Sequence, residues 1–162
     1  MTAARLPHQV DEASGLLREM RIRTREHTYS ALELFLFSAA TWNPHRVHYD
    51  QDYTRGVAGE PELVVQGPLQ AAHMFQLLRE ALADGVAVRA LEYRHRAVLH
   101  AGEPVRISGR LVSGDWAGAT AEMWVESSHS GQRTTTGLAH VERTGAQRQA
   151  SRPAGTRTRE GT

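Results

Sequence analysis

The sequence predicts one α+β domain in which an antiparallel sheet packs around a single long helix. After the Gly67–Pro68 turn, apolar side chains recur at helical spacing until Gly85 ends the pattern. Four later runs alternate apolar and polar side chains, which is the period of strands with one buried face. A helix followed by consecutive strands is typical of the α+β class, and we expect this helix to form the core.

Local signals define the elements on either side of this helix. Residues 23–29 are predicted to form a short strand, and Ser30 precedes Glu33 at the spacing of a capping box, which predicts a helix over 31–40. Residues 41–62 are polar and predicted to be a loop. The four strand runs cover residues 91–96, 105–111, 119–126 and 134–141, with turns at 100–104, 113–117 and 127–131, the last being a hairpin.

The predicted domain covers residues 21–142 and lies between two segments that have little to bury. Residues 1–20 form an N-terminal extension with enough aliphatic side chains for a short helix. Residues 143–162 are rich in arginine and contain no aromatic or branched aliphatic side chain. We therefore expect a disordered tail there.

The composition excludes several classes of chemistry. The 162 residues contain no cysteine, which excludes disulfides, thiolate nucleophiles and cysteine-ligated metals. All 19 basic residues are arginine, so Schiff-base chemistry and a P-loop lysine are excluded. A formal net charge of +1 gives no global attraction to nucleic acid or to an anionic membrane. No apolar run is long enough to span a bilayer, and residues 1–20 lack the apolar stretch of a signal peptide, so we expect a cytoplasmic protein.

A cluster of hydrogen-bonding and titratable side chains makes the predicted loop a candidate site. Asn43, His45, His48, Tyr49 and Asp50 lie there within a few positions of one another. Imidazoles and carboxylates exchange protons, and functional residues concentrate on loops. A metal site built from the two histidines and the aspartate is an alternative that we do not predict.

Two segments of the chain resemble a known family. FSAATWNPHRVHYDQDY and ELVVQGPLQA are similar to the MaoC-like hot-dog hydratases and dehydratases. The closest branch contains mesaconyl-CoA hydratase and the type 2 hydroxyacyl-thioester dehydratases, with SA-x-T-x-N-x-HRIHYD and GLVVHGPL segments. The resemblance covers about residues 30–142 and implies a hot-dog fold. It also implies reversible hydration of a 2-enoyl thioester on coenzyme A or acyl carrier protein, with no cofactor and no metal.

The resemblance assigns roles to particular residues. His48 matches the catalytic histidine, and the backbone N–H of Gly67 matches the donor to the thioester carbonyl. A helix N-terminus suits that second role because its free N–H groups and its dipole favour developing negative charge. The neighbouring Gln66, Pro68, Tyr49 and Asp50 are assigned to substrate binding.

Two positions depart from the family pattern. The commoner MaoC motif, D-x-N-P-x-H, has an aspartate five residues before the histidine, where this chain has Asn43. The closest branch often has asparagine at this position, and Asn43 is not a general base but is assigned to orienting the water in the catalytic site. Gln66 replaces the histidine of the second segment, and an amide does not shuttle protons. His45 or Asp50 is left as the second proton carrier, although Asp50 serves equally well as a cap or turn residue.

One hot-dog module in place of the two found in many relatives implies assembly with a second chain. We expect a homodimer, with a higher homo-oligomer or a heterodimer with a second hot-dog chain as alternatives. Two other functions stay open. One is a non-catalytic or repurposed subunit that binds acyl thioesters, which the residues at positions 43 and 66 favour. The other is a hot-dog thioesterase, which needs an acidic residue near the thioester, and the central helix has none before Glu80.

Overall fold

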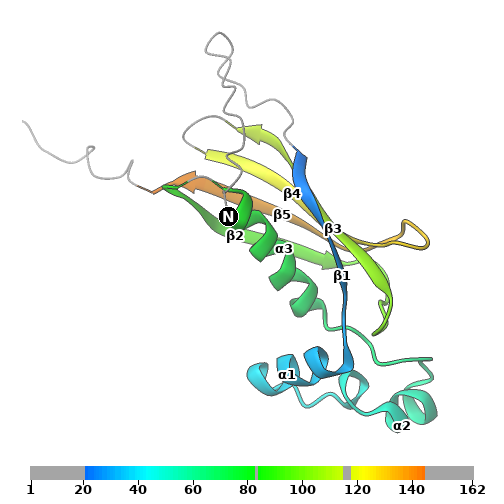
Figure 1. Cartoon of the computed structure of the whole chain (residues 1–162). Coiled ribbons are helices and arrows are strands. Elements are labelled where there is room, and N and C mark those ends of the chain that lie inside the picture. The colour runs from blue at the N-terminus through cyan, green and yellow to red at the C-terminus, as the bar shows by residue number, and fades with distance from the viewer. Residues whose placement is uncertain (1–20, 83, 115–117, 145–162) are drawn as a thin grey trace, which may run out of the picture.

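The protein is an antiparallel sheet of five strands packed against one long helix. The computed structural model describes residues 21–82, 84–114 and 118–144. The elements are β1 (Arg21–Thr28), α1 (Ala31–Thr41), η1 (Arg46–His48), α2 (Gln51–Tyr53), η2 (Thr54–Ala58), α3 (Gly67–Ala81), β2 (Val86–His95), β3 (Pro104–Gly114), β4 (Gly118–Ser127) and β5 (Arg133–Arg143). The sheet curves along one side of α3 (Figure 1), which confirms the predicted α+β architecture.

The strand order of the sheet is β1-β3-β4-β5-β2, and every neighbouring pair is antiparallel. β1 and β2 are therefore the two edges, although β2 directly follows the helix in the chain. β4 and β5 form the predicted hairpin, in which Gly131 donates from its N–H to Ser127 and adopts a positive φ of 69°. Alternate residues of β4 are buried, as expected for a strand with one face on a core.

α3 presents one apolar face to the sheet. Met74 and Leu78 are fully buried at its centre, beside Leu69 and Ala71. Ala71 allows the close approach predicted for the small residues of this helix, whereas Ala72 is exposed and takes no part in it. The helix therefore forms the core, together with the inner face of β3, β4 and β5.

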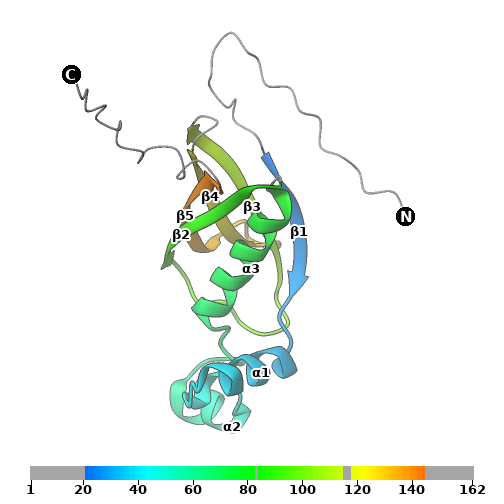
Figure 2. The same ribbon diagram turned by 90° about the vertical axis from the view of Figure 1, so that its left-hand side faces the viewer.

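α1 and the short helical turns lie beyond the N-terminal end of α3, outside the sheet (Figure 2). Ser30 caps α1 by accepting a hydrogen bond from the Glu33 N–H, which confirms one bond of the predicted capping box. Residues 41–62, predicted to be a loop, instead contain η1, α2 and η2, because Asp50 caps the second of these by accepting from the Tyr53 N–H. These turns bring the candidate side chains close to the start of α3.

Other boundaries also differ from the sequence prediction. α3 ends at Ala81 and β2 begins at Val86, so the strand starts earlier than the predicted residue 91. The predicted N-terminal helix lies outside the described residues, and so does the predicted tail beyond residue 144. None of the described helices is long and apolar enough to cross a membrane.

Candidate active site

His48 is fixed to the strand-like segment that precedes α3. Its Nδ1 lies 2.7 Å from the Val64 carbonyl oxygen, and the Val64 N–H donates to the Val47 carbonyl at 3.0 Å. Thr54 is fully buried and donates to the Asp50 carbonyl at 2.7 Å, which fixes the backbone just after His48. These bonds hold the half-buried His48 ring in one orientation.

The same contact decides where the His48 proton lies. A carbonyl oxygen only accepts, so Nδ1 carries the proton and Nε2 keeps its lone pair. Nε2 makes no hydrogen bond with any residue that the structure describes. Burial lowers the pKa of His48, and a nearby charge on His45 lowers it further, although the bond to Val64 opposes both. His48 is therefore a neutral imidazole near pH 7 with a basic nitrogen available.

The start of α3 supplies a free backbone donor three residues after Val64, the residue to which His48 is bonded. Gln66 is the N-cap and makes no side-chain capping bond, and Pro68 has no N–H. Within the described chain, the N–H of Gly67 has no acceptor. Because Gly67 follows Val64 by three residues, the chain allows at most about 10 Å between their Cα atoms. A free N–H at a helix N-terminus is suited to binding an oxygen that gains negative charge.

His95 occupies the space beside Gly67. A Cβ atom built on Gly67 would overlap the His95 ring, so the glycine provides room for an imidazole. The Nδ1 of His95 lies 3.1 Å from Thr135 Oγ1, which donates its own proton to the buried Gln70 at 2.8 Å. His95 is not among the site residues predicted from the sequence, since no local signal shows that the end of β2 meets the start of α3.

Asn43 and His45 form the turn that leads into η1. Asn43 Oδ1 accepts from the His45 N–H at 3.2 Å, and His45 Nδ1 accepts from the Val47 N–H at 3.3 Å. The rings of His45 and His48 have centroids 5.7 Å apart. His45 is exposed and lies beside His48. The side-chain oxygen of Asn43, in contrast, already accepts the hydrogen bond from the His45 N–H.

Asp50, Tyr49 and Pro68 have different surroundings. Asp50 accepts two bonds from Arg46, at 2.7 and 2.9 Å, and one from the Tyr53 N–H, and these contacts lower its pKa. Tyr49 donates to the Pro44 carbonyl at 2.8 Å. Pro68 is exposed at the start of α3. The substrate-binding roles of these three residues stay predictions, and Asp50 has a structural role as a cap.

Gln66 connects α1 to the start of α3. Its Nε2 donates to the Leu34 carbonyl at 2.8 Å and to Ser38 Oγ at 2.9 Å, and the side chain is 1% exposed. Its Oε1 is buried and has no partner among the described atoms. The predicted substrate-binding role of Gln66 stays a prediction, and in this structure its side chain faces α1.

Trp42 ends α1 with an unusual backbone conformation. It has a φ of 51° and a ψ of 38°, in the left-handed region that costs a non-glycine residue about 1–2 kcal/mol. Its side chain is 93% exposed. The helix end therefore presents an indole to solvent next to Asn43.

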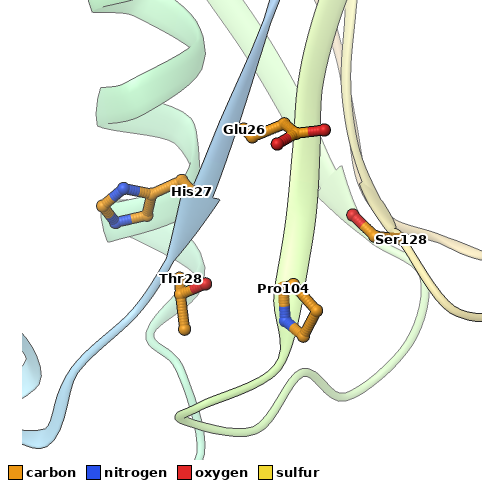
Figure 3. A pocket seen from close by; sticks show the side chains of 5 residues that line it. All are labelled: Glu26, His27, Thr28, Pro104 and Ser128. Carbon is orange, nitrogen blue, oxygen red and sulfur yellow. The ribbon is translucent and has the colours of Figure 1, made fainter.

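Two surface hollows lie near the site elements, and neither includes His48 or Gly67 in its lining. One has a volume of about 480 Å³ and is lined by Glu26, His27, Thr28, Pro104 and Ser128 (Figure 3). The other, about 420 Å³, is mostly apolar and runs along α1, lined by Ser30, Leu32, Glu33, Leu36, Phe37 and Leu69. The second hollow is the more apolar of the two, and it reaches α3 at Leu69.

One group of described side chains has metal-ligand spacing. Glu33 lies 3.1 Å from His27 Nε2 and 3.2 Å from His73 Nε2, and the three ligand atoms are within 4.8 Å of one another. Figure 3 shows His27 pointing from β1 toward α3, away from Glu26. Burial lowers the pKa of His73. The hydrogen bonds within this group satisfy it without an ion, and the predicted loop residues His45, His48 and Asp50 do not form such a group within the described ranges.

Comparison with known proteins identifies the family. A family model described as hydroxyacyl-thioester dehydratase type 2 matches residues 5–101, which is more than half of the chain. The chain belongs to this family. The predicted resemblance is thereby confirmed, and this hydroxyacyl-thioester dehydratase family consists of hydratases and dehydratases that act on acyl thioesters.

Two named relatives of this type 2 dehydratase family match along part of their length. The mesaconyl-C(4)-CoA hydratase of Chloroflexus aurantiacus is 39% identical over 77 residues, which are 48% of this chain and 27% of the relative. The mitochondrial hydroxyacyl-thioester dehydratase type 2 of Saccharomyces cerevisiae is 26% identical over 91 residues, or 55% and 31% of the two chains. The matched region thus spans less than a third of either relative.

The fold of this chain is similar to that of a solved structure. The (R)-hydratase of A. caviae involved in PHA biosynthesis superposes with a TM-score of 0.71 at 21% identity, covering 80% of this chain and 98% of that one. The predicted hot-dog fold is confirmed by this match.

Proposed function

We propose that this protein reversibly adds water across the double bond of a 2-enoyl thioester, with His48 as acid and base and the Gly67 N–H as donor to the thioester oxygen. The hydrogen bond from His48 to Val64 carries the proposal. This bond leaves Nε2 of His48 free as a base. It also ties the ring to Val64, which is three residues before the first residue of α3, a helix with no side-chain cap at its N-terminus. Membership of the hydratase and dehydratase family supports the same chemistry.

The proposed reaction uses each group for one part of the chemistry. His48 Nε2 takes a proton from water while the water oxygen bonds to the β-carbon. The electron pair of the double bond moves toward the thioester, and the resulting enolate oxygen accepts a hydrogen bond from Gly67. A proton then reaches the α-carbon. Coenzyme A and acyl carrier protein are the two proposed carriers of the acyl group.

A carboxylate-dependent thioesterase is less compatible with this structure. The described part of α3 has one acidic residue, Glu80, which pairs with Arg25 of β1. Glu80 lies thirteen residues from Gly67, which is about 20 Å along a helix. A hydrolytic water activated there would be too far from a thioester bound at Gly67.

The proposal includes a second copy of the chain in a cytoplasmic homodimer. Leu32, Phe35 and Leu36 of α1 are each more than half exposed, beside the apolar hollow. Adjacent exposed apolar side chains on a helix favour a covering partner. Light scattering of the purified chain is expected to give twice 17.9 kDa, whereas a monomer would favour the heterodimer with a second hot-dog chain.

The test is absorbance-monitored hydration of crotonyl-CoA by the wild type and by His48→Ala. We expect turnover by the wild type and a loss of about 10²–10⁴-fold in kcat for the variant, the usual contribution of an acid/base residue. His129→Ala, an exposed histidine in the β4–β5 turn, is the matched control and should retain activity. Full activity of His48→Ala would contradict the proposal. A silent wild type that gains activity as Asn43→Asp would favour the repurposed subunit.

A further inference from the structure

The proposed reaction requires a group that exchanges the α-proton, and Asn43 stands where relatives of the MaoC pattern have a carboxylate. Asn43 has no proton to exchange near neutral pH, and its Oδ1 already accepts from His45. Asp50 is held by Arg46 and the Tyr53 N–H, which keep its pKa low. A different acid/base group beside the thioester is therefore needed.

His95 has the position that this role requires. Its ring lies against Gly67, in the space that any larger residue at position 67 would fill. In a bound thioester, the α-carbon is one bond from the carbonyl carbon whose oxygen the Gly67 N–H would hold. An imidazole in contact with Gly67 is thus beside the α-carbon as well. His95 is also exposed, so a substrate has access to it.

The hydrogen bonds of His95 fix its tautomer in the same way as those of His48. Thr135 Oγ1 donates its proton to Gln70 Oε1, so its oxygen accepts from His95 Nδ1–H at 3.1 Å. The Nε2 lone pair of His95 then faces the start of α3. Gln70 and Thr135 are both buried, which makes this chain of bonds rigid. His95 therefore lies with its Nε2 against Gly67, and His48 is bonded to Val64, three residues before that glycine.

We propose that His95 is a second catalytic residue, which exchanges the α-proton of the acyl thioester, while His48 acts on the water at the β-carbon. This inference rests on the proposed function. In hydration, the imidazolium form of His95 gives its Nε2 proton to the α-carbon of the enolate and is reprotonated from solvent, while the proton that His48 took from water returns to solvent. In dehydration, Nε2 removes the α-proton and the hydroxyl leaves from the β-carbon with a proton from His48.

The contact between Gly67 and His95 provides a test by double substitution. Gly67→Ala should displace the exposed His95 ring, with loss of its bond to Thr135, rather than unfold the helix, because alanine is favourable in a first helical turn. Its loss of activity should therefore match that of His95→Ala, and the double variant should lose no more than either single variant. Losses that add in the double variant would show that the glycine acts independently of His95.

The deciding experiment separates the two proton transfers. Crotonyl-CoA hydration by His95→Ala should fall about 10²–10³-fold in kcat, with partial recovery on adding free imidazole. His140→Ala, an exposed histidine on β5, should stay within twofold of the wild type. With the saturated thioester butyryl-CoA in deuterium oxide, the wild type and His48→Ala should exchange the α-hydrogens, whereas His95→Ala should not. Proton NMR of the α-carbon position measures this exchange.

The outcomes separate failure of the inference from failure of the proposed function. An active wild type whose His95→Ala variant keeps full turnover and full α-exchange overturns the role of His95 alone. Loss of α-exchange in His48→Ala but not in His95→Ala overturns it as well. A wild type that neither hydrates crotonyl-CoA nor exchanges α-hydrogens overturns the proposed function, and the role of His95 in that reaction with it.

Discussion

The sheet with α3 and the segment of residues 41–66 are stabilised by different interactions. The sheet and helix enclose apolar side chains, with Met74 and Ile107 fully buried. The segment depends on directional hydrogen bonds, such as those from Thr54 to Asp50 and from His48 to Val64. Apolar burial is non-directional, whereas a hydrogen bond is lost when one partner moves. Substitutions should therefore reduce global stability in the first region and disturb the site geometry in the second.

The largest expected effect is on the stability of the sheet with α3. Met74→Ala removes a fully buried side chain at the centre of α3 and should lower the free energy of unfolding by about 2–5 kcal/mol. Urea denaturation followed by circular dichroism measures the change. Gln76→Ala, at an exposed position of the same helix, should change it by no more than about 0.5 kcal/mol. Equal effects of the two variants would mean that α3 is not the core.

A smaller and more local effect is expected in the hydrogen-bonded segment. Thr54→Val keeps the shape of the buried side chain but removes the donor to Asp50, at a cost of about 1–3 kcal/mol. Amide hydrogen exchange of Val64, whose N–H bonds to Val47 in the same loop, should accelerate. The amides of β4 and β5 should keep their protection. Uniform acceleration across the sheet would contradict the separation of the two regions.

The pH dependence of activity tests the proposed role of His48, in the segment of residues 41–66, as a base. Burial lowers the pKa of His48 below its usual 6.5, so the basic form predominates until the pH falls under that value. kcat/KM for hydration should then decrease about tenfold per pH unit below the His48 pKa. His45→Ala removes a charge that lowers this pKa and should move the acid limb upward. If the acid limb of the wild type were centred above pH 6.5, the lowered pKa of His48 would be contradicted.

The smallest expected effect concerns His100, which joins the two regions. Burial lowers the pKa of His100, but its hydrogen bonds to Glu60 and Glu103 outweigh this and raise it above 6.5. A pKa that is higher in the folded state means that the charged pairs stabilise the fold below pH 6.5 and lose this effect as pH rises through the folded value. The difference in Tm between wild type and His100→Gln should be larger at pH 5.5 than at pH 8.5. Its size should correspond to about 1 kcal/mol or less, and a larger difference at pH 8.5 would reverse the assigned sign.

The same contrast explains what the sequence could predict. Periodicity identified α3 and the strands because apolar burial leaves a repeating pattern, and the family segments identified His48 and Gly67 as candidates. The helical turns of residues 41–62 were missed because single contacts, such as the Asp50 cap, hold them. The contact of His95 with Gly67 joins the ends of two elements far apart in the chain, and no local pattern encodes it.

The end of α1 also gives the protein an optical reporter. Trp42 is 93% exposed, so its indole should emit at the long wavelengths of tryptophan in water. Trp124 differs, because it is partly buried with the guanidinium of Arg133 stacked 4.4 Å over its ring. Covering of Trp42 by a second chain or by an acyl group would remove water from the indole and shift its emission to shorter wavelength. In a variant that keeps Trp42 as its single tryptophan among the three of the sequence, fluorescence titration would then follow assembly and substrate binding without any added label.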